Sequence, residues 1–319
     1  MTSVEEIIQR WKTDRPVYKG LCKYVKAQLK AGLYDEGLYA EVTGRLKETV
    51  SLLKKVKSKS DKGTYTYENA TDKLGVRIVC NYKEQLPFVD KIVKERFDIK
   101  KFEDKAEGLE ENEFSYTSWH YDLSVKADAP VEYHSLIFEL QVRTINQHAW
   151  ACTAHELSYK QEISLPKLLK RKVFRLSALH EIADGELSTL NDYVSNHEEF
   201  EPFKLLKLLE APFYQTAKMD FNKTLTFEFS KKVLDANLFS FEIDYQTFLS
   251  FIESNKPKIK HIFKEYRQNP AISYIISQPE TLLVWYLLQK IKFQFKDFFE
   301  ENYDQEELNI MENCWGVIE

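Results

Sequence analysis

The stretch from residue 138 to residue 160 changes its period part-way along and constrains the fold more than any other part of the chain. Its first residues alternate, which would place Glu139, Gln141 and Arg143 on one face of a strand and apolar residues on the other. After Thr144, apolar residues recur at roughly helical spacing. The pattern predicts a strand with a polar face that leads directly into a helix. Such a strand is either an ordinary half-exposed strand or the floor of a polar site.

Composition limits the classes of protein to which the chain could belong. Its 319 residues, 43% hydrophobic and 30% charged, suit a globular protein of one large domain or two ordinary ones. The formal net charge of -5 argues against a protein that coats nucleic acid but is compatible with a local basic patch. Four widely spaced cysteines without a Cys-x-x-Cys pair favour reduced thiols. With no secretory signal pattern and no apolar run of roughly 18 residues, we expect a cytoplasmic protein without a membrane segment.

Two features before residue 81 are candidates for a ligand site. Seven Lys or Arg residues lie between Arg45 and Lys62, against two acids. Such a run is usually a solvated helix face, but clustered guanidinium and ammonium groups also complement the oxygens of a triphosphate. The second feature is Arg77, which interrupts an apolar run, Val76 to Cys80, that is typical of a buried strand. A buried arginine needs a carboxylate, a phosphate or a base as its partner.

Further elements follow from periodicity and from helix-breaking residues. An amphipathic helix is expected to break near Pro16, and a second to run from Val17 to Leu33. Trp150 and His155 are expected to pack the helix that follows the polar strand against the sheet. Cys80 and Cys152 are expected to be small buried residues. Beyond residue 200 the chain is expected to be helical and rich in Phe and Tyr. The other expected elements are a helix from Pro87 to Phe97, a strand from Ile99 to Phe102 and a helix from Lys167 to Asp184.

Four blocks of the sequence, in order, resemble the signatures of the RelA/SpoT-type synthetase domain, whose members make (p)ppGpp. They are a basic donor-site element (44–55), a D-x-x-G-x-R element (72–77), a loop ending in SYxSxH (115–120) and the strand–helix stretch with its ExQxRT, HAWA, HE and YK sequences (139–160). The sequence departs from the commoner residues at Gly44, Ser115 and Ala154. The resemblance covers roughly residues 40–190.

The resemblance implies a donor site for ATP. Arg45 and Arg77 occupy the positions that sandwich the adenine. Asp72 and Glu139 occupy the positions that hold Mg2+, and Glu139 is our choice for the base that activates the acceptor hydroxyl. The residues implied to hold the triphosphate are Lys47, Ser51 and either Lys54 or Lys55.

The resemblance also implies an acceptor site. Tyr116 is the position whose ring stacks on the acceptor guanine, and His148 is the position at its base edge. Gln141 shares the polar strand face with these groups. The residues expected near the acceptor phosphates or in the network that closes the site are Lys105, His120 and Arg143. The loop before Tyr116 is unusually acidic, with Lys105 as its one cation.

The implied fold is α+β, a nucleotidyltransferase-like mixed β-sheet flanked by helices and followed by a largely helical C-terminal region. We expect a synthetase domain with N-terminal helices over residues 1–195 and a helical extension over residues 196–319. The extension is compatible with self-assembly into a homo-oligomer, with autoinhibition or with partner sensing. The family's hydrolase domain would carry a His-Asp motif, and no His-Asp pair occurs in the sequence.

Three functions are compatible with these residues. The leading hypothesis is transfer of the β,γ-diphosphate of ATP to the 3′-hydroxyl of GDP or GTP, with Mg2+ as cofactor. The alternative is a toxin-like enzyme that modifies the 3′ end of tRNA, which the acidic loop favours together with a row of lysines at helical spacing, Lys19, Lys23, Lys26 and Lys30. The third is an inactive nucleotide-binding regulator, against which the presence of both Asp72 and Glu139 argues.

Overall fold

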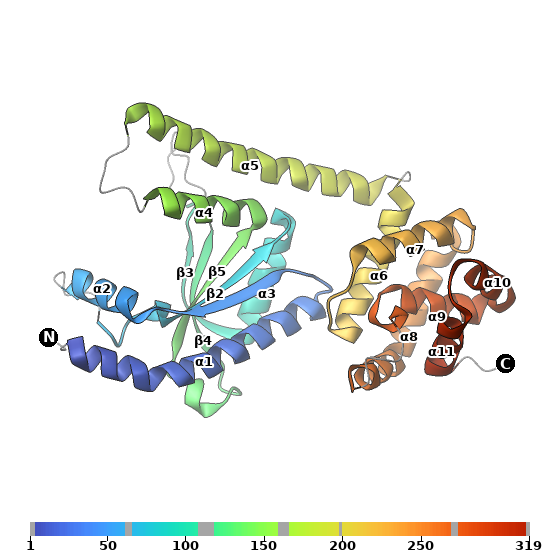
Figure 1. The fold of residues 1–319 in the computed structure, drawn as a ribbon, viewed down its shortest axis with the longest axis horizontal. Helices are drawn as coiled ribbons and strands as arrows, with labels where there is room; N and C mark the ends of the chain where they lie inside the picture. Colours follow the sequence, from blue (N-terminus) through green and yellow to red (C-terminus); the bar gives the residue numbers. More distant parts are fainter. Residues whose placement is uncertain are drawn as a thin grey trace. The chain divides into compact units, whose positions relative to one another are not determined.

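The computed structural model of the chain describes residues 4–60, 66–107, 118–158, 166–197, 200–268 and 274–316 (Figure 1). The chain divides into two compact units. The N-terminal unit comprises Met1–Leu33 and Ala40–Thr189, and the C-terminal unit comprises Tyr34–Tyr39 and Leu190–Glu319.

A five-stranded mixed sheet is the centre of the N-terminal unit. Its strand order is β1-β2-β5-β4-β3, in which only β2 and β5 pair in parallel. The sheet and its flanking helices confirm the predicted fold class, including the switch from strand to helix at Thr144. The elements of this unit are α1 (Val4–Asp35), β1 (Glu41–Leu46), α2 (Thr49–Ser60), β2 (Leu74–Cys80), α3 (Leu86–Arg96), β3 (Phe97–Asp104), β4 (Trp119–Val125), β5 (Ile137–Thr144), α4 (Ile145–Ser158) and α5 (Lys167–Asn196).

The two faces of the sheet differ in polarity, as the alternation in β5 predicts. Phe138, Leu140 and Val142 are each 0% exposed, whereas the residues between them are only half-buried. α1 packs closely on β1, since a Cβ atom at Gly44 would lie 2.8 Å from the sulfur of Cys22. This close approach explains why residue 44 is glycine, at a position where RelA/SpoT-type sequences commonly have serine.

The predicted break at Pro16 is wrong, because α1 is one helix from Val4 to Asp35 with Pro16 inside it. The buried stripe continues on both sides of the proline, through Trp11 before it and Tyr18 after it. Pro16 itself is exposed, so the carbonyl that loses its helical hydrogen bond can be hydrated. Packing of the apolar face therefore outweighs the missing bond.

α4 and α5 are joined through a small polar cluster. Asp184 of α5 accepts hydrogen bonds from Thr144 Oγ1 at 2.5 Å and from Asn146 Nδ2 at 2.8 Å, and it is 2% exposed. Trp150 of α4 is buried with its ring centroid 5.8 Å from that of His180 on α5. Trp150 is therefore buried as expected, but the ring contact it makes here is with α5 and not with the sheet. The side chain of His155 lies outside the described residues.

The two cysteines predicted to be buried differ. Cys80 is buried in β2, and burial raises the pKa of its thiol to about 12. The prediction for Cys152 is wrong, since this residue is exposed on α4. The helix α4 is only weakly amphipathic, so its sequence does not show which of its faces is buried.

The C-terminal unit is all helical in its described part, as predicted. α9 forms its centre, since every residue from Glu280 to Leu288 is buried. Trp285 of this helix stacks on Trp315 with ring centroids 4.6 Å apart. No helix in the described ranges is long and apolar enough to cross a membrane. The helices are α6 (Glu201–Ala217), α7 (Lys223–Asp235), α8 (Phe241–Gln268), α9 (Glu280–Lys290), α10 (Lys292–Asn302) and α11 (Gln305–Trp315).

The cluster around Asp184 leads to a stability prediction. Asp184→Ala removes the carboxylate that accepts from the hydroxyl of Thr144 and from the amide of Asn146. We expect this to cost about 1–3 kcal/mol of folding free energy. We expect amide hydrogen exchange in residues 167–189 to accelerate accordingly. Glu181→Ala, one turn away and exposed, is the control. Equal protection of α5 in both variants would show that the cluster does not hold the helix.

Candidate active site

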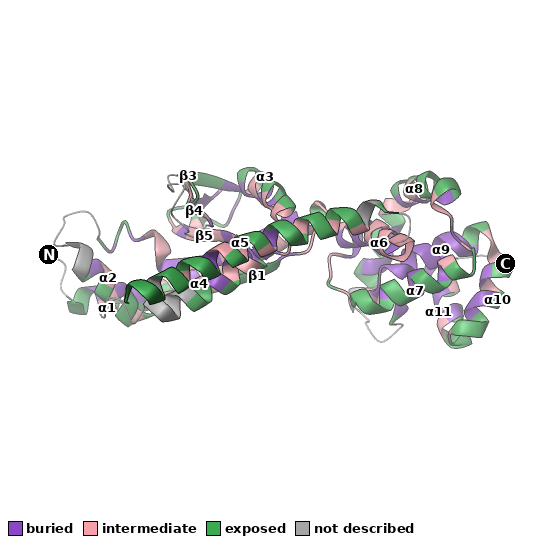
Figure 2. Ribbon diagram, turned by 90° about the horizontal axis from the view of Figure 1, so that it is seen from above, coloured by how far each residue is buried: buried purple, intermediate pink, exposed green. Residues whose placement is uncertain are grey.

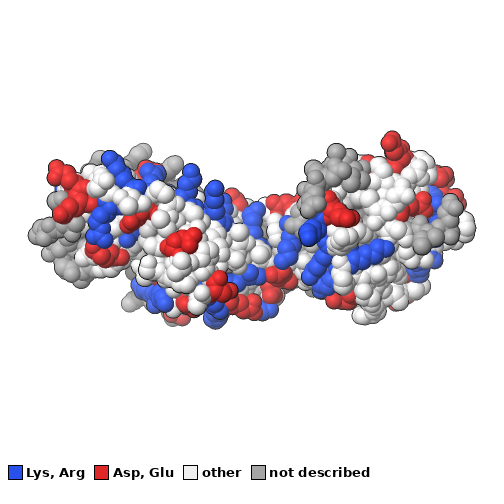
Figure 3. All heavy atoms as spheres, turned by 90° about the horizontal axis from the view of Figure 1, so that it is seen from below, with Lys and Arg blue, Asp and Glu red and all other residues white. Residues whose placement is uncertain are grey.

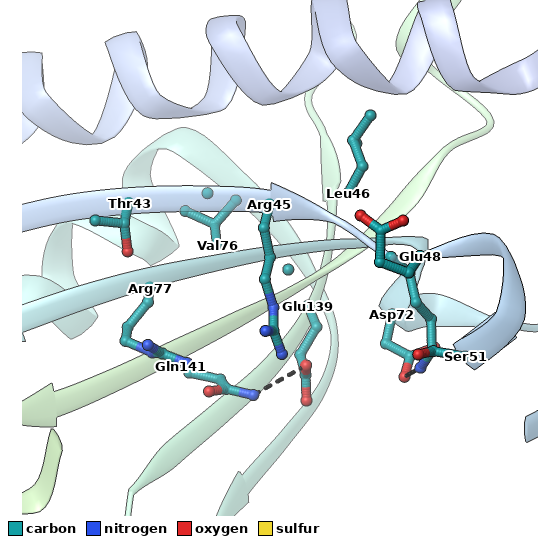
Figure 4. Close-up of a pocket in the computed structure, with 13 residues that line it drawn as sticks. Thr43, Arg45, Leu46, Glu48, Ser51, Asp72, Val76, Arg77, Glu139 and Gln141 are labelled. Carbon is teal, nitrogen blue, oxygen red and sulfur yellow. Dashed lines mark hydrogen bonds and ion pairs between the residues drawn. The ribbon is translucent and has the colours of Figure 1, made fainter. Parts of the chain in front are cut away.

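A cavity of about 480 Å³ opens on the polar face of the sheet beside β1, β2 and β5. In Figure 4, Leu46 points toward α1, whereas Arg45 and Glu139 point to the opposite side. Residues that the sequence marks as ligand-binding make up much of the lining, although they come from separate motif blocks. The lining residues are Thr43, Gly44, Arg45, Leu46, Lys47, Glu48, Ser51, Asp72, Gly75, Val76, Arg77, Glu139 and Gln141.

The register of the sheet brings the separate blocks together. β1 pairs with β2 so that Arg45 lies opposite Gly75. β2 pairs with β5 so that Gly75 lies beside Glu139 and Arg77 lies beside Gln141. Directly paired residues point to the same face of a sheet, so the arginines and the carboxylate share one surface. Strand pairing, and not proximity in sequence, therefore builds the cavity.

Gly75 leaves an opening in this surface, between Arg45 and Glu139. A Cβ atom added there would meet no atom of the described residues within 4 Å. Its φ angle is ordinary, since it is not among the glycines of positive φ, so backbone conformation does not require glycine. The missing side chain instead keeps the floor of the cavity open. Gly75 is the glycine of the D-x-x-G-x-R element. The motif marks this position, but the sequence alone did not indicate that its role is to leave space.

Asp72 is the anchor of the basic groups. Lys47 and Lys55 both donate to its Oδ2 atom, and the backbone nitrogen of Lys47 donates to the carbonyl oxygen of Lys73 at 2.9 Å. Lys55 is partly buried, whereas Lys54 is exposed. Of the two lysines left open by the sequence, the structure thus places Lys55 at the carboxylate.

A buried lysine holds the segment that carries Asp72. Lys73 is 5% exposed, and its Nζ atom lies 4.1 Å from the ring centroid of Tyr67. The hydroxyl of Tyr67 in turn donates to Asp14 of α1 at 2.6 Å. Burial lowers the pKa of Lys73 despite the nearby carboxylates. These contacts fix the turn before β2. No local sequence pattern signals this support, because Tyr67 is anchored by Asp14 of the distant helix α1.

Glu139 sits in a hydrogen-bonded chain. Its Oε1 atom lies 3.1 Å from Nδ1 of His120, and its Oε2 atom accepts from Gln141 at 3.0 Å. The other ring nitrogen of His120 lies 2.8 Å from the hydroxyl of Ser118. Burial acts to raise the pKa of Glu139, but the hydrogen bonds with His120 and Gln141 outweigh it and hold the pKa below its usual value. The carboxylate is therefore ionised at neutral pH.

The same chain fixes the tautomer of His120. An ionised Glu139 can only accept, so Nδ1 of His120 must carry the proton between them. When the ring is neutral, its Nε2 atom then accepts from the hydroxyl of Ser118. Ser118 is thus a supporting residue that sequence reasoning matched to the motif without giving it a role.

Basic groups gather beside Gln141. The Nε atoms of Arg77 and Arg143 are buried without a hydrogen-bond partner in the described part of the chain. Burial, and then the charge of Arg77, lower the pKa of Arg143. Burial, and then these two arginines, lower the pKa of His148. A cluster that lowers the pKa values of its own members is suited to an anion or to the polar edge of a base.

The remaining predicted acceptor residues are only partly described. Lys105 is exposed and pairs with Glu103 of β3. Its backbone nitrogen donates to the carbonyl oxygen of Ser118 at 3.2 Å, which ties the loop entrance to β4. Tyr116 lies outside the described residues, so its predicted stacking role stays a prediction.

The cavity contains carboxylate oxygens, which are the type of ligand that Mg2+ prefers. Asp72 and Glu139 present carboxylates to one cavity, and the charge of Asp72 acts to raise the pKa of Glu139. Within the described ranges, no group of three or more His, Cys, Asp or Glu residues is placed to hold a metal ion. Two carboxylates suit Mg2+, which completes its shell with water and substrate phosphates.

Comparison with known proteins places this region in a family. The family model described as "Region found in RelA / SpoT proteins" matches residues 44–164. The chain carries a RelA/SpoT domain. The matched segment contains the whole lining of the cavity except Thr43, so the cavity belongs to this domain.

Two relatives and one solved structure extend the match. GTP pyrophosphokinase YjbM from Bacillus subtilis is 26% identical over 192 residues, which cover 58% of this chain and 90% of that protein. GTP pyrophosphokinase YwaC from the same organism is 24% identical over 179 residues, covering 53% of this chain and 84% of the relative. The crystal structure of small alarmone synthetase 1 from Bacillus subtilis bound to its product pppGpp matches with a TM-score of 0.50 and 27% identity, covering 59% of this chain and all of that one (100%).

The network around Glu139 generates a prediction that needs no enzymatic assay. In His120→Ala the carboxylate loses a hydrogen bond and a favourable charge while its burial remains, so the pKa of Glu139 should rise. Carbon-detected NMR titration of the labelled carboxyl group measures this directly. His134→Ala, which alters a histidine bonded to the carbonyl oxygen of Ala129, should leave the titration unchanged. An unshifted curve in His120→Ala would show that the imidazole does not hold the pKa down.

Proposed function

We propose that the protein is an ATP-dependent pyrophosphokinase that transfers the β,γ-diphosphate of ATP to the 3′-hydroxyl of GDP or GTP and releases AMP. In this reaction the 3′-oxygen bonds to the β-phosphorus as the bond from that phosphorus to the oxygen of AMP breaks. The observation that carries the proposal is the convergence of Arg45, Asp72, Arg77 and Glu139 on one cavity. The relatives named GTP pyrophosphokinase and the pppGpp-bound structure support it.

The donor would lie over β1 and β2. Arg45 and Arg77 flank the opening above Gly75, where a flat base can lie between two guanidinium planes. Lys47, Ser51 and Lys55 lie on the side of Asp72, where they would hold the triphosphate. An incoming phosphate would draw the lysine ammonium groups away from the carboxylate of Asp72.

Mg2+ is the cofactor that we propose, held by Asp72 and Glu139. When bound, it would neutralise charge on the transferring phosphates and align them with the acceptor. Once the lysines bind phosphate, the carboxylate of Asp72 can turn to the cation. This exchange of partners couples donor binding to assembly of the site.

Glu139 is the group that we assign to take the proton of the acceptor hydroxyl. It is ionised at neutral pH, and His120 and Gln141 orient its two oxygens. A positioned base of this kind typically contributes about 10²–10⁴-fold in rate. Ser118 and His120 are positioning residues in this scheme, since they hold the carboxylate and do not themselves reach the reacting bond.

The acceptor would lie toward Arg143 and His148. The depressed pKa of His148 keeps its ring neutral at pH 7, so it can both donate to and accept from a base edge. The unpaired Nε atom of Arg143 supplies a cationic donor nearby. Both carboxylates face the same cavity as the basic groups, which argues against an inactive nucleotide-binding regulator.

One observation favours tRNA as a second candidate acceptor. On α1, Lys19 and Lys23 are exposed, and Lys26 and Lys30 are partly exposed. Figure 3 looks onto the side on which α1 lies in Figure 1, and there Lys and Arg are interspersed with Asp and Glu. A tRNA held through several phosphates needs such cations, whereas GDP or GTP binds within the cavity alone.

The opening at Gly75 provides a test of the donor site. Gly75→Val should fold normally, because the added atoms meet open space, but should fill the floor between the two arginines. We expect ATP affinity to fall by about 1–3 kcal/mol, roughly 10- to 100-fold, as for other overpacked sites. Gly185→Val is the matched control, since an added Cβ there also meets no described atom within 4 Å. If a folded Gly75→Val protein binds ATP as tightly as the wild type, ATP does not bind over Gly75.

The acceptor is tested with ATP labelled at the γ-phosphate, Mg2+ and either GDP, GTP or deacylated tRNA. We expect the label on the guanosine nucleotide, little change when Lys19, Lys23 and Lys26 are replaced together by Ala, and no transfer by Glu139→Gln. Label on tRNA alone, with a steep loss as salt rises and in the lysine variant, would establish the second candidate instead. No labelled acceptor of either kind would contradict the proposed reaction.

A further inference from the structure

The short 3-10 turn that precedes β2, Thr71–Lys73, carries two charged neighbours with different surroundings. The carboxylate of Asp72 lines the cavity, whereas Lys73 is 5% exposed and takes no part in the lining. The Nζ atom of Lys73 lies 4.1 Å from the ring centroid of Tyr67 and 5.8 Å from that of Tyr18 on α1. One turn therefore joins a carboxylate of the cavity to an ammonium group that is buried against α1.

The ammonium group of Lys73 is held by aromatic rings. Within the part of the chain that the structure describes, no hydrogen bond or ion pair reaches its Nζ atom. The face of an aromatic ring attracts a cation, and it does so more strongly where water is excluded. An apolar side chain of similar length would be buried at this position at lower cost. Burial alone therefore does not account for a lysine, whereas a fixed contact with the two rings does.

Helix α1 holds these rings in place. The hydroxyl of Tyr67 donates to Asp14 of α1 at 2.6 Å, and the guanidinium carbon of Arg10 lies 4.7 Å from the centroid of the same ring. Tyr18, the second ring near the ammonium group, belongs to the buried residues of α1, which are coloured purple in Figure 2. Three residues of α1 thus support the turn that carries Asp72, although none of them lines the cavity.

The backbone of Lys73 is held separately from its side chain. Its carbonyl oxygen accepts from the backbone nitrogen of Lys47 at 2.9 Å. A single backbone bond leaves the turn free to rotate about it, so the side chain of Lys73 is needed to fix the direction in which Asp72 points. Replacing that side chain leaves the backbone bond to Lys47 in place and tests the buried anchor alone.

We propose that Lys73 is a positioning residue of the donor site, and that it holds Asp72 where the carboxylate can bind Mg2+ together with the phosphates of the donor. This role rests on the proposed function, because the assignment of Asp72 as a metal ligand belongs to it. Lys73 itself touches neither the nucleotide nor the cation. Mg2+ demands near-ideal octahedral geometry, so a small displacement of one carboxylate matters. Residues that orient a metal ligand typically change metal affinity by about 10- to 100-fold when they are replaced.

The test measures binding of AMPCPP, an ATP analogue with a methylene group between the α- and β-phosphorus, to the full-length chain by isothermal titration calorimetry. Mg2+ should strengthen binding by the wild type. In Lys73→Met, the Mg2+ concentration needed for half of this gain should rise about tenfold or more, while binding without Mg2+ should stay unchanged. Tyr67→Phe keeps the ring but loses its bond to Asp14, and it should shift the Mg2+ dependence in the same direction by less. It provides the same comparison if Lys73→Met does not fold.

Lys12→Met is the matched control, since it makes the same replacement at an exposed lysine of α1. It should leave both the binding of AMPCPP and its dependence on Mg2+ unchanged.

An Asp72→Asn background separates positioning from a general loss of stability. If Lys73 acts through Asp72, adding Lys73→Met to Asp72→Asn should cause no further change in the Mg2+ dependence. A further loss in the double variant would show that Lys73 acts on the fold as a whole and would overturn the proposal. So would a folded Lys73→Met protein whose Mg2+ dependence overlays that of the wild type. A wild-type chain that does not bind AMPCPP, or binds it with no effect of Mg2+, would contradict the proposed function itself and so remove the basis of this role.

Discussion

The parallel pairing of β2 with β5 is the interaction on which the site depends. It sets Gly75 beside Glu139 and Arg77 beside Gln141, and so joins motif blocks that are distant in sequence. The register is fixed from the opposite face, where Phe138, Leu140 and Val142 are fully buried. Each such side chain contributes about 1.5–3 kcal/mol. A slip of one residue would exchange these for Glu139 and Gln141 in the core, so the hydrophobic side of the strand determines where its polar side lies.

Charged groups of both signs are already paired in the cavity that we propose for the triphosphate. Asp72 is balanced by Lys47 and Lys55, and Glu139 is held by His120 and Gln141. Arg77, by contrast, keeps a buried Nε atom without a hydrogen-bond partner in the described residues. A triphosphate that binds Lys47 and Lys55 would free the carboxylate of Asp72 to bind a cation. The bound nucleotide would also supply a partner for the guanidinium of Arg77. In the proposed reaction this exchange of partners would take place when the donor binds, so that little reorganisation would remain for the transfer itself.

Periodicity and motif spacing predicted the strand β5, its polar face, the helix that follows and the arginine in β2, because each of these is a local pattern. They failed at Pro16, where packing of Trp11 and Tyr18 on distant elements keeps α1 continuous. They could not choose between Lys54 and Lys55, since one residue of helix rotation decides which reaches Asp72. The support at Lys73 was missed because Tyr67, over which its ammonium group lies, is held by Asp14 of the distant helix α1. The role of Ser118 was missed although its partner His120 is only two residues away, because that role follows from the contact of His120 with Glu139 on another strand.

An enzyme that transfers a diphosphate from ATP releases AMP, whereas one that transfers a single phosphate releases ADP. The nucleotide that leaves therefore tests the proposed reaction most directly. Phosphorus NMR of a reaction with ATP, Mg2+ and GDP should show AMP and a guanosine product with a 3′-diphosphate, formed in equal amounts. Appearance of ADP with a singly phosphorylated acceptor would contradict the account, because attack would then occur at the γ-phosphorus and not at the β-phosphorus.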